Sequence, residues 1–179
     1  MIDTERLLLR PWIEADREPF VHMFRDPEVS EWLGGRRTRE QALASFAAMP
    51  AFWAEHGYGQ LAIVGRADGA LLGRVGCRRQ PPEWKHPMMG EVEIGWLLAR
   101  GAWGHGYASE AAAAVLPWGF KTLGVATIFS WTARINHRSE AVMRRIGMTR
   151  AAERDFEHPD LAADDPLRSH VVYRIERPG

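Results

Sequence analysis

Two repeating patterns of apolar residues divide the chain into predicted strands and helices. Short apolar runs, several of them alternating with polar residues and ending at turn residues, predict strands, whereas apolar residues three or four positions apart predict helices. The predicted strands are residues 6–12, 60–64, 71–77, 91–98, 126–132, 149–156 and 170–175. The predicted helices are residues 16–25, 38–56, 138–146 and a segment that follows residue 106 and ends near residue 121.

Local signals mark several boundaries of these elements. Thr38 and Gln41 have the spacing of a capping box, which predicts the start of a helix. Asp68-Gly69 lies between two strand-like runs and predicts a hairpin turn. Pro50 and Pro117 lie inside helical patterns, where a proline is expected to kink the helix or end it early.

The order of these elements limits the fold class. Strands dominate, helices occur singly between them, and one pair of strands forms a hairpin, which favours a mixed α/β (α+β) sheet over a regular parallel one. No repeat or linker divides the sequence, so residues 1–179 are expected to form a single domain.

The stretch from Trp103 to Ala111 combines a strand, a short glycine-rich turn and a helix start. Such a turn places free backbone N–H groups beside a helix N-terminus, which suits a phosphate group. Gly104 and Gly106 leave the backbone uncovered, so that a pyrophosphate can approach it closely. A G-x-G before a helix is also a common tight connection, and at this point both interpretations stand.

Two better-known nucleotide-binding loops fit this stretch poorly. A Walker loop requires Lys and then Ser or Thr after its second glycine, whereas Gly106 is followed by Tyr107-Ala108. A dinucleotide-binding loop requires an acidic residue at the end of the next strand, and residues 126–131 have none.

Composition adds few constraints. Apolar residues make up 46% and charged residues 26% of the chain, as in ordinary globular proteins. Lys plus Arg and Asp plus Glu number 23 each, which argues against a nucleic-acid partner. The single cysteine, Cys77, fits a reducing compartment, and no signal peptide or membrane span is visible, so we expect a cytoplasmic protein. The histidines lack metal-binding spacing, so no metal is expected.

Four motifs in order resemble the GNAT superfamily of N-acetyltransferases, and within it the RimJ/RimL-type branch of ribosomal-protein N-terminal acetyltransferases. They are Thr4-Glu5-Arg6-Leu7-Leu8-Leu9-Arg10-Pro11, Glu93-Ile94-Gly95-Trp96, the stretch from Trp103 to Ala111, and Asn136-His137-Arg138-Ser139 followed by Ile146-Gly147-Met148. The resemblance implies a GNAT fold: a mostly antiparallel mixed sheet of about seven strands, flanked by helices, with splayed middle strands.

The resemblance also implies the reaction and the site. Acetyl-CoA is the expected cosubstrate, and an amine, either a protein N-terminus or a small molecule, attacks its thioester directly. The oligomeric state is not indicated, and a homodimer remains open. The residues that the resemblance assigns to acetyl-CoA are Trp96, Leu97, Leu98, Trp103, Gly104, His105, Gly106, Tyr107, Ala108, Ser109, Asn136 and Ser139.

The sequence departs from the wider family at two positions. Trp103 stands where the family usually has Gln or Arg, although a Trp at this position resembles the RimJ/RimL-type branch. Met143 stands where many members have a Tyr that protonates the leaving thiolate, and a thioether cannot donate a proton. The resemblance to the branch suggests Ser139 as the substitute.

Glu91 and Glu93 are candidates for the base that takes the amine proton. They alternate with apolar residues, so both carboxylates are expected on one face of a strand, where a partly desolvated pair can raise one pKa. Glu93 matches the branch motif and is preferred as the catalytic base. The alternative is that both carboxylates are solvated or paired with arginines.

Further residues have two possible roles. Asn136 is expected either to bind the cofactor or to cap a helix, and His105 either to face phosphate or to point to solvent. Trp32, Trp53 and Trp84 lie in segments expected near the acceptor, with core packing as the alternative. Five acids crowd the last loop between strands and are expected to attract a cationic amine or simply to be solvated: Asp155, Glu157, Asp160, Asp164 and Asp165.

The sequence therefore predicts an acetyl-CoA-dependent N-acetyltransferase. The alternative from another class is an acyl-CoA-binding module without catalysis, motivated by Met143. A nucleotide-binding oxidoreductase is the most distant possibility.

Overall fold

The computed structural model describes residues 1–83 and 85–179, and nine strands in this part of the chain form one sheet. The order across the sheet is β1-β2-β3-β4-β5-β6-β9-β7, and β8 also pairs with β9. The strands are β1 (Ile2–Asp3), β2 (Leu7–Arg10), β3 (Gln60–Gly65), β4 (Leu71–Arg79), β5 (Val92–Leu98), β6 (Thr127–Ala133), β7 (Thr149–Arg150), β8 (Phe156–Glu157) and β9 (Ser169–Glu176).

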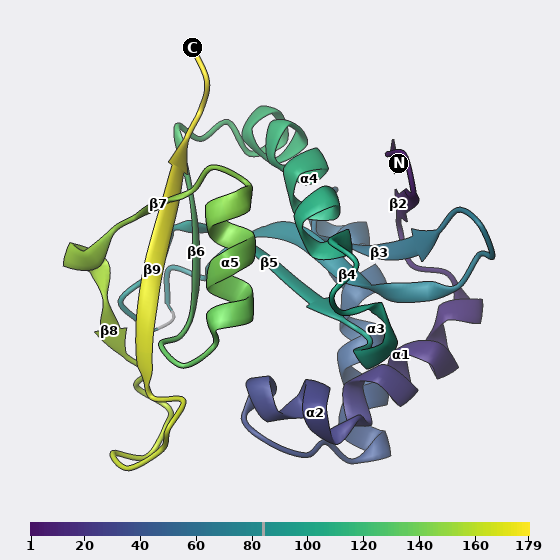
Figure 1. The fold of residues 1–179 in the computed structure, drawn as a ribbon, viewed down its shortest axis with the longest axis horizontal. Coiled ribbons are helices and arrows are strands. Elements are labelled where there is room, and N and C mark those ends of the chain that lie inside the picture. Colours follow the sequence, from purple (N-terminus) through teal and green to yellow (C-terminus); the bar gives the residue numbers. More distant parts are fainter. Residues whose placement is uncertain (84) are drawn as a thin grey trace.

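Neighbouring strands are antiparallel except for β5 and β6, which are parallel and part after one register pair, Glu93 with Phe129. By contrast, β4 and β5 stay paired from Gly73–Leu98 to Arg79–Val92. Figure 1 shows β5 and β6 diverging in the middle of the sheet. The splayed mixed sheet expected from the sequence is confirmed.

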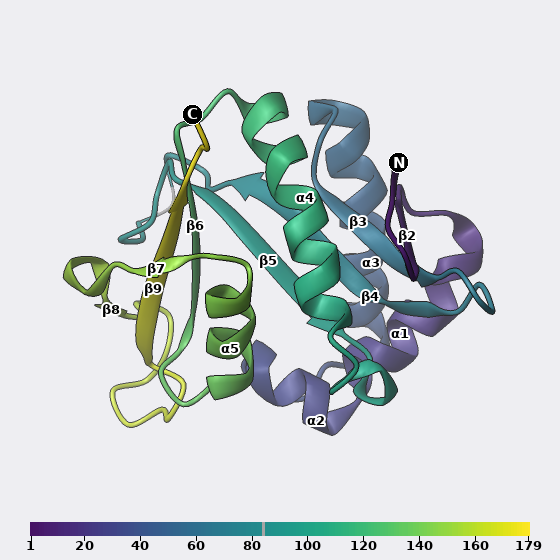
Figure 2. The same ribbon diagram turned by 45° about the horizontal axis from the view of Figure 1, so that its top comes forward.

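Helices cover both faces of the sheet. Figures 1 and 2 show α4 crossing the face of β3, β4 and β5 that is opposite to α1 and α3. The α-helices are α1 (Arg17–Arg25), α2 (Pro27–Ser30), α3 (Arg39–His56), α4 (Tyr107–Leu123) and α5 (His137–Arg145). Short 3₁₀ turns are η1 (Glu14–Asp16), η2 (Glu31–Leu33), η3 (Arg100–Ala102) and η4 (Ala152–Arg154).

Alternation along the strands divides the core into two layers. In β4 and β5, Val75, Cys77 and Ile94 pack with α4 and α5, together with Met143 and Ile128. The other face of the sheet packs with α1 and α3 through residues of the alternate positions, such as Ala62 and Val64 of β3. Because successive side chains point to opposite faces, Arg74, Arg78 and Glu93 project from the α1–α3 face of the sheet.

Pro50 and Pro117 were expected either to kink or to end their helices, and the second alternative is wrong. Helices α3 and α4 continue through Pro50 and Pro117 instead of ending there. A proline inside a helix removes one hydrogen bond and costs about 3 kcal/mol. Burial of neighbouring residues offsets this cost: Phe46 is buried before Pro50, with Phe52 and Trp53 half-buried after it, and Leu116 and Phe120 are buried around Pro117.

The single strand predicted for residues 149–156 is broken into β7, η4 and β8. The break occurs because Asp155 Oδ1 accepts a hydrogen bond from the backbone N–H of Val172 at 3.1 Å, in the place that a strand carbonyl would take. Asp155 also pairs with Arg150 and Arg134. The Asp155 side chain therefore interrupts the backbone hydrogen bonding with β9. The alternation of apolar residues in the sequence does not indicate this interruption.

Gly76 is a position where the sheet depends on the lack of a side chain. A Cβ there would overlap the carbonyl oxygen of Gly59 and lie 2.5 Å from Cα of Gln60, and both neighbours are backbone. We expect Gly76→Ala to lower the free energy of unfolding by about 1–3 kcal/mol, because the backbone must move. Urea denaturation measures this change. Gly101→Ala, where a Cβ meets no atom within 4 Å, is the control, and an equal effect of both substitutions would contradict the explanation.

Candidate active site

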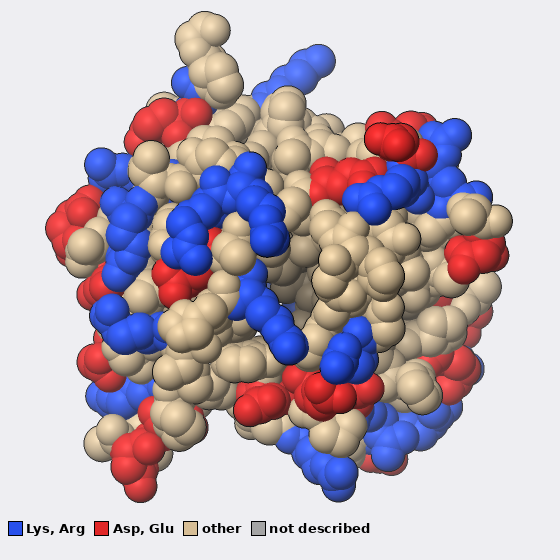
Figure 3. Space-filling model, viewed as in Figure 1, with Lys and Arg blue, Asp and Glu red and all other residues tan. Residues whose placement is uncertain are grey.

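A cleft of about 960 Å³ occupies the place where β5 and β6 part. It is lined by the starts of α4 and α5, by the segment after α2 and by the loop between β8 and β9. Figure 3 shows a hollow near the centre of this face of the molecule, with basic side chains around it. Residues far apart in the sequence therefore meet in one cavity large enough for a small-molecule cofactor.

The glycine-rich turn forms the start of α4. Gly104 and Gly106 have φ values of 82° and 80°, in the left-handed region that glycine adopts readily. Gly106 is the N-cap residue, and no side chain caps the first turn of the helix. The first amide groups of α4 are thus available to an anion, at the positive end of a helix of 17 residues. Ser109 Oγ is buried beside them without a hydrogen-bond partner in the described structure.

Arg6, which lies just before β2, holds this turn in place. Its Nε donates to Glu110 Oε2 at 2.7 Å, and its Nη1 donates to the carbonyl oxygen of His105 at 3.0 Å. The guanidinium also lies 4.7 Å from the ring centroid of Tyr107. Thr4 Oγ1 donates to Glu110 at 2.6 Å. The turn is therefore fixed before any ligand arrives, which lowers the entropy cost of binding.

Basic residues surround Trp103 at this end of the cleft. The Trp103 indole donates from Nε1 to the carbonyl oxygen of Leu98 at 2.9 Å, which fixes the ring. The guanidinium groups of Arg100 and Arg138 lie 4.9 Å and 4.7 Å from its centroid. Trp103 thus contacts two cations that line the cleft, of which Arg100 also pairs with Glu28 at 2.8 Å. Cations at a helix N-terminus favour a phosphate-bearing ligand.

Glu93 lies at the point where β5 and β6 part. Its Oε2 accepts a hydrogen bond from Gln80 Nε2 at 2.5 Å. Burial raises the pKa of Glu93 to about 7, although nearby Arg74 and Arg78 oppose the shift by favouring the charged form. Gly95 leaves space beside the carboxylate, since a Cβ there would lie 3.6 Å from Glu93 Oε1. A carboxylate with a near-neutral pKa and open space beside it has the properties of a general base.

The expected cause of this pKa shift is wrong. Glu91 pairs with Arg154 at 3.0 Å, and the guanidinium of Arg154 lies over the ring of Phe129. Glu91 is not among the groups that shift the pKa of Glu93. Desolvation of Glu93, and not repulsion between two carboxylates, therefore raises its pKa.

The start of α5 brings Asn136 and Ser139 to the cleft. Asn136 Oδ1 accepts a hydrogen bond from the backbone N–H of Ser139 at 3.2 Å, so Asn136 caps α5. Both residues line the cleft, so the cap does not exclude a contact with a ligand. Met143, one turn further, is 1% exposed and also lines the cleft.

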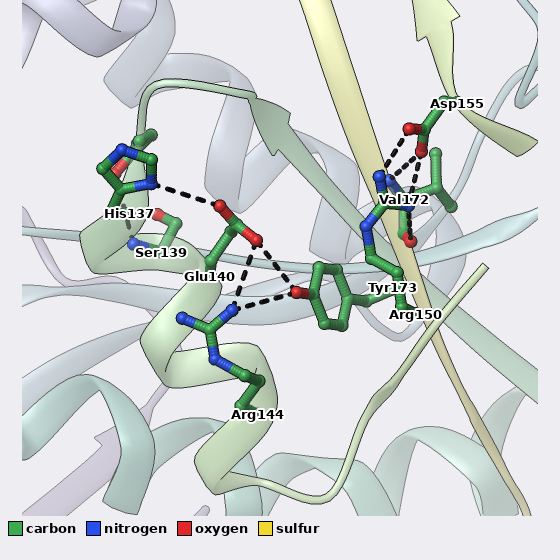
Figure 4. Close-up of polar contacts among 9 residues, drawn as sticks. His137, Ser139, Glu140, Arg144, Arg150, Asp155, Val172 and Tyr173 are labelled. Atoms are coloured by element: carbon green, nitrogen blue, oxygen red, sulfur yellow. Dashed lines mark hydrogen bonds and ion pairs between the residues drawn. The ribbon is translucent and has the colours of Figure 1, made fainter. Parts of the chain in front are cut away.

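A polar network fixes α5 against β9 (Figure 4). Glu140 Oε2 accepts a hydrogen bond from the Tyr173 hydroxyl at 2.9 Å, and Arg144 Nη1 donates to the same hydroxyl at 3.1 Å. Figure 4 shows Glu140 pointing from α5 towards Tyr173, with His137 and Ser139 at the start of the helix. The network holds the first turn of α5, and with it Ser139, at the cleft.

The loop between β8 and β9 borders the cleft, but its acids do not line it in the described structure. His158, Leu161, Leu167 and His170 are its lining residues. Burial lowers the pKa of His170 and so favours the neutral form of its ring. Two of the five acids are held by arginines, Asp155 by Arg150 and Glu157 by Arg168.

The predicted site residues come together, with one exception. Glu93, Ser139 and all the predicted cofactor residues line the cleft except His105, whose side chain is exposed and whose ring stacks on Tyr107 at 5.6 Å. Trp32 lines the cleft, Trp53 packs against Trp118 instead, and Trp84 lies outside the described residues. Sequence reasoning missed several lining residues, for which no motif gives a signal: Arg37, Arg74, Arg100, Arg145 and Gln60.

The described residues contain neither a candidate metal-binding cluster nor a candidate membrane-spanning helix. Within residues 1–83 and 85–179, no group of three or more His, Cys, Asp or Glu side chains is placed to hold a metal ion. No helix in the same part of the chain has the length and apolar character needed to cross a membrane.

Comparison with known proteins places this cleft in context. The family described as Acetyltransferase (GNAT) domain matches residues 6–149. The FsC-acetyl coenzyme A-N(2)-transacetylase of Aspergillus fumigatus is 29% identical over 184 residues, which cover 98% of this chain and 76% of that protein. The crystal structure of an acetyltransferase from Agrobacterium tumefaciens is 34% identical, with a TM-score of 0.76 over 98% of this chain and 94% of that one.

The ribosomal branch is less well supported. The ribosomal-protein-S5-alanine acetyltransferase of Vibrio fischeri superposes with a TM-score of 0.74 over 97% of this chain and 94% of that one, at 15% identity. A likeness at this identity shows the common fold alone, because one fold serves many substrates. The RimJ/RimL-type assignment therefore stays a prediction.

The raised pKa of Glu93 has a consequence for stability. Because the pKa rises from 4.5 in the unfolded chain to about 7 in the folded protein, the folded state binds more protons between these values. The contribution of Glu93 to the free energy of unfolding is therefore fully present below pH 4.5 and is lost as the pH rises through about 7. We expect the stability of the wild type relative to Glu93→Gln to fall across this window, measured by urea denaturation at successive pH values. A constant difference would contradict the assignment.

Proposed function

The chain belongs to the GNAT acetyltransferase family, whose members use acetyl-CoA, and on this premise we propose that it transfers an acetyl group from acetyl-CoA to a primary amine by direct attack in the cleft. The observation that carries the proposal is the arrangement of two features in one cavity. An anion-binding helix start lies at one end, and Glu93, with a pKa near 7, lies where the strands part.

The helix start fits the diphosphate of acetyl-CoA. The uncapped amides of the first turn of α4 and the unpaired hydroxyl of Ser109 offer hydrogen-bond donors to phosphate oxygens. Arg100 and Arg138 supply positive charge beside them. We assign the phosphates to the turn from Gly104 to Ser109, with His105 contributing its backbone and not its ring.

The parted strands fit the rest of the cosubstrate. Trp96, Leu97 and Leu98 of β5 have no register partner in β6, so backbone groups at this edge are free to pair with the amides of a pantetheine chain. Pairing along a strand edge orients an extended ligand without a special side chain. We therefore place the thioester beside Glu93 and Gly95.

Glu93 and Ser139 complete the chemistry. Glu93 accepts the proton that the attacking amine loses as the new N–C bond forms, directly or through a water molecule. As the C–S bond breaks, the Ser139 hydroxyl donates a hydrogen bond to the departing sulfur, which leaves as a thiolate and takes its proton from water. A thiol has a pKa of about 8.5, so a thiolate leaves readily with little acid assistance, and turnover does not require a proton donor at Met143.

The alternative is an acyl-CoA-binding module without catalysis. A module of this kind has no need of a desolvated carboxylate at the point where the strands part. The near-neutral pKa of Glu93 therefore supports catalysis.

The turn at α4 provides a test of cosubstrate binding. Gly106→Val places a β-branched residue at a φ of 80° and distorts the turn. We expect calorimetry to show acetyl-CoA binding by the wild type and at least about tenfold weaker binding, or about 1.4 kcal/mol, by the variant. Gly124→Val at the other end of α4, with a φ of 64°, is the matched control and should keep the wild-type affinity. No binding by the folded wild type would overturn the proposal.

The role of Glu93 is tested by kinetics. We expect kcat/KM of the wild type to rise with pH through about 7, as Glu93 loses its proton. Glu93→Gln should lower kcat by about 10²–10⁴-fold and remove this part of the profile. Glu91→Gln, two residues away and paired with Arg154, is the matched control. Equal loss in both variants would assign the effect to structure and not to proton transfer.

A further inference from the structure

We propose that the acceptor is a small amine that also carries a carboxylate, of the amino-acid class, and that Arg74 and Arg37 bind this carboxylate while Glu93 takes the amine proton. The inference rests on the proposed function and names its substrate class. It depends on two guanidinium groups that line the cleft and that no carboxylate of the described residues pairs with.

Arg74 is a partly buried cation without an anionic partner. It lies on β4, on the face of the sheet opposite to α4, and lines the cleft beside Gln60. Its Nη1 donates to Gln60 Oε1, which is a neutral acceptor, and its buried Nε has no hydrogen-bond partner in the described structure. Burial lowers the pKa of Arg74 to about 10, and Glu93 acts on it only through space.

Arg37 repeats this arrangement from a different segment. It lies between η2 and α3 and lines the cleft near Trp32 and Leu33. Its Nη2 donates to the carbonyl oxygen of Leu33, and its buried Nε also lacks a partner in residues 1–83 and 85–179. Two arginines from segments far apart in the sequence therefore reach the same cleft with unused donors.

A desolvated guanidinium group without an anionic partner lowers the stability of the folded protein unless a ligand supplies the missing hydrogen bonds and negative charge. A desolvated guanidinium without a counter-charge loses hydration that neutral acceptors replace only in part. A carboxylate restores this loss through charge-assisted hydrogen bonds, which the planar fork of Arg forms two at a time. Both arginines are thus suited to an oxyanion on the substrate.

The cosubstrate phosphates do not account for these two arginines. The phosphate-binding turn is the start of α4, whereas Arg74 projects from the opposite face of the sheet. Arg100 and Arg138 already supply cations around Trp103 at that end. Arg74 and Arg37 are left for the acceptor.

The charge of the cleft also excludes one class of acceptor. Among the described lining residues, Glu93 is the single acid, while five arginines line the cleft: Arg37, Arg74, Arg100, Arg138 and Arg145. Of these, Arg100 is paired with Glu28 at 2.8 Å, outside the lining. A polyamine or an aminoglycoside would place additional ammonium groups against these cations. An amine with a nearby carboxylate matches both signs, because its ammonium group faces Glu93 and its carboxylate faces the arginines.

The apolar part of the cleft lining indicates which side chain the acceptor carries. Trp32, Leu161 and Leu167 line the cleft with apolar surface, and burial favours the neutral form of His170, which also lines it. Apolar side chains on the acceptor would bury surface here. We therefore expect amino acids with apolar side chains to be the best acceptors within the class.

The test compares amines that differ only in the carboxylate. Thiol release from saturating acetyl-CoA is measured with amino acids, with the matching amino-acid carboxamides, and with spermidine and kanamycin. Rates are corrected for the fraction of unprotonated amine, because a carboxamide makes its amine less basic. We expect kcat/KM for an amino acid to exceed that for its carboxamide by about tenfold or more.

Variants of Arg37 and Arg74 test whether these two residues cause the preference for amines with a carboxylate. Arg37→Gln and Arg74→Gln should raise KM for amino acids and reduce the ratio of carboxylate to carboxamide towards one. Arg36→Gln removes an exposed arginine that does not line the described cleft, and it should keep the wild-type ratio. Near-UV circular dichroism checks that each variant is folded, and Arg74→Lys keeps the charge if Arg74→Gln does not fold.

The outcomes separate this inference from the proposed function. Thiol release that is equal for carboxylates and carboxamides, or greater for spermidine or kanamycin, would overturn the inference and leave acetyl transfer standing. A preference that survives both arginine variants would also overturn it. Absence of acetyl-CoA binding in calorimetry would instead overturn the proposed function.

Discussion

Between β5 and β6 the sheet holds together at one register pair, Glu93 with Phe129, and the site depends on this constraint. Two neighbouring parallel strands normally satisfy each other's backbone groups along their length. Because these two part, one edge of β5 is left for a ligand and a cleft crosses the sheet from α4 to the opposite face. Glu93 occupies the junction, where it is desolvated by both strands and open to the cleft. Its raised pKa is therefore a consequence of the same parting that creates the cavity.

The two ends of the cleft have different chemistry because they belong to different faces of the sheet. At the α4 end, backbone amides, Ser109 and stacked arginines form a site for phosphate. Elsewhere in the cleft, Arg74 and Arg37 are incompletely bonded cations, and Arg74 lies close enough to Glu93 to act on its pKa. A bridge from Arg6 to Glu110 fixes the first end, and hydrogen bonds from Tyr173 and Arg144 to Glu140 fix the start of α5. Rigid supports on both sides hold the reacting groups at defined positions.

Sequence reasoning and the structure differ at several positions. Glu93 was identified through a motif and a supposed carboxylate pair, yet its pKa depends on burial and Glu91 is bound to Arg154. Alternation predicted both residues on one side of the strand but carried no information about Arg154, which lies 63 residues from Glu91. Pro50 and Pro117 were expected to kink or end helices that in fact continue, because local propensity does not include the burial that outweighs it.

The sequence by itself determined the class of fold, the hairpin at Asp68-Gly69, the glycine turn before α4 and the cap at Asn136, since each depends on residues within one turn or strand of one another. Periodicity and turn chemistry are local properties and can be read without the fold. Only the tertiary structure decided which side chains share the cleft, which acids are held by arginines, and that Arg37 and Arg74 lack an anionic partner. These properties depend on contacts between distant segments and on desolvation, and no local pattern records either of them.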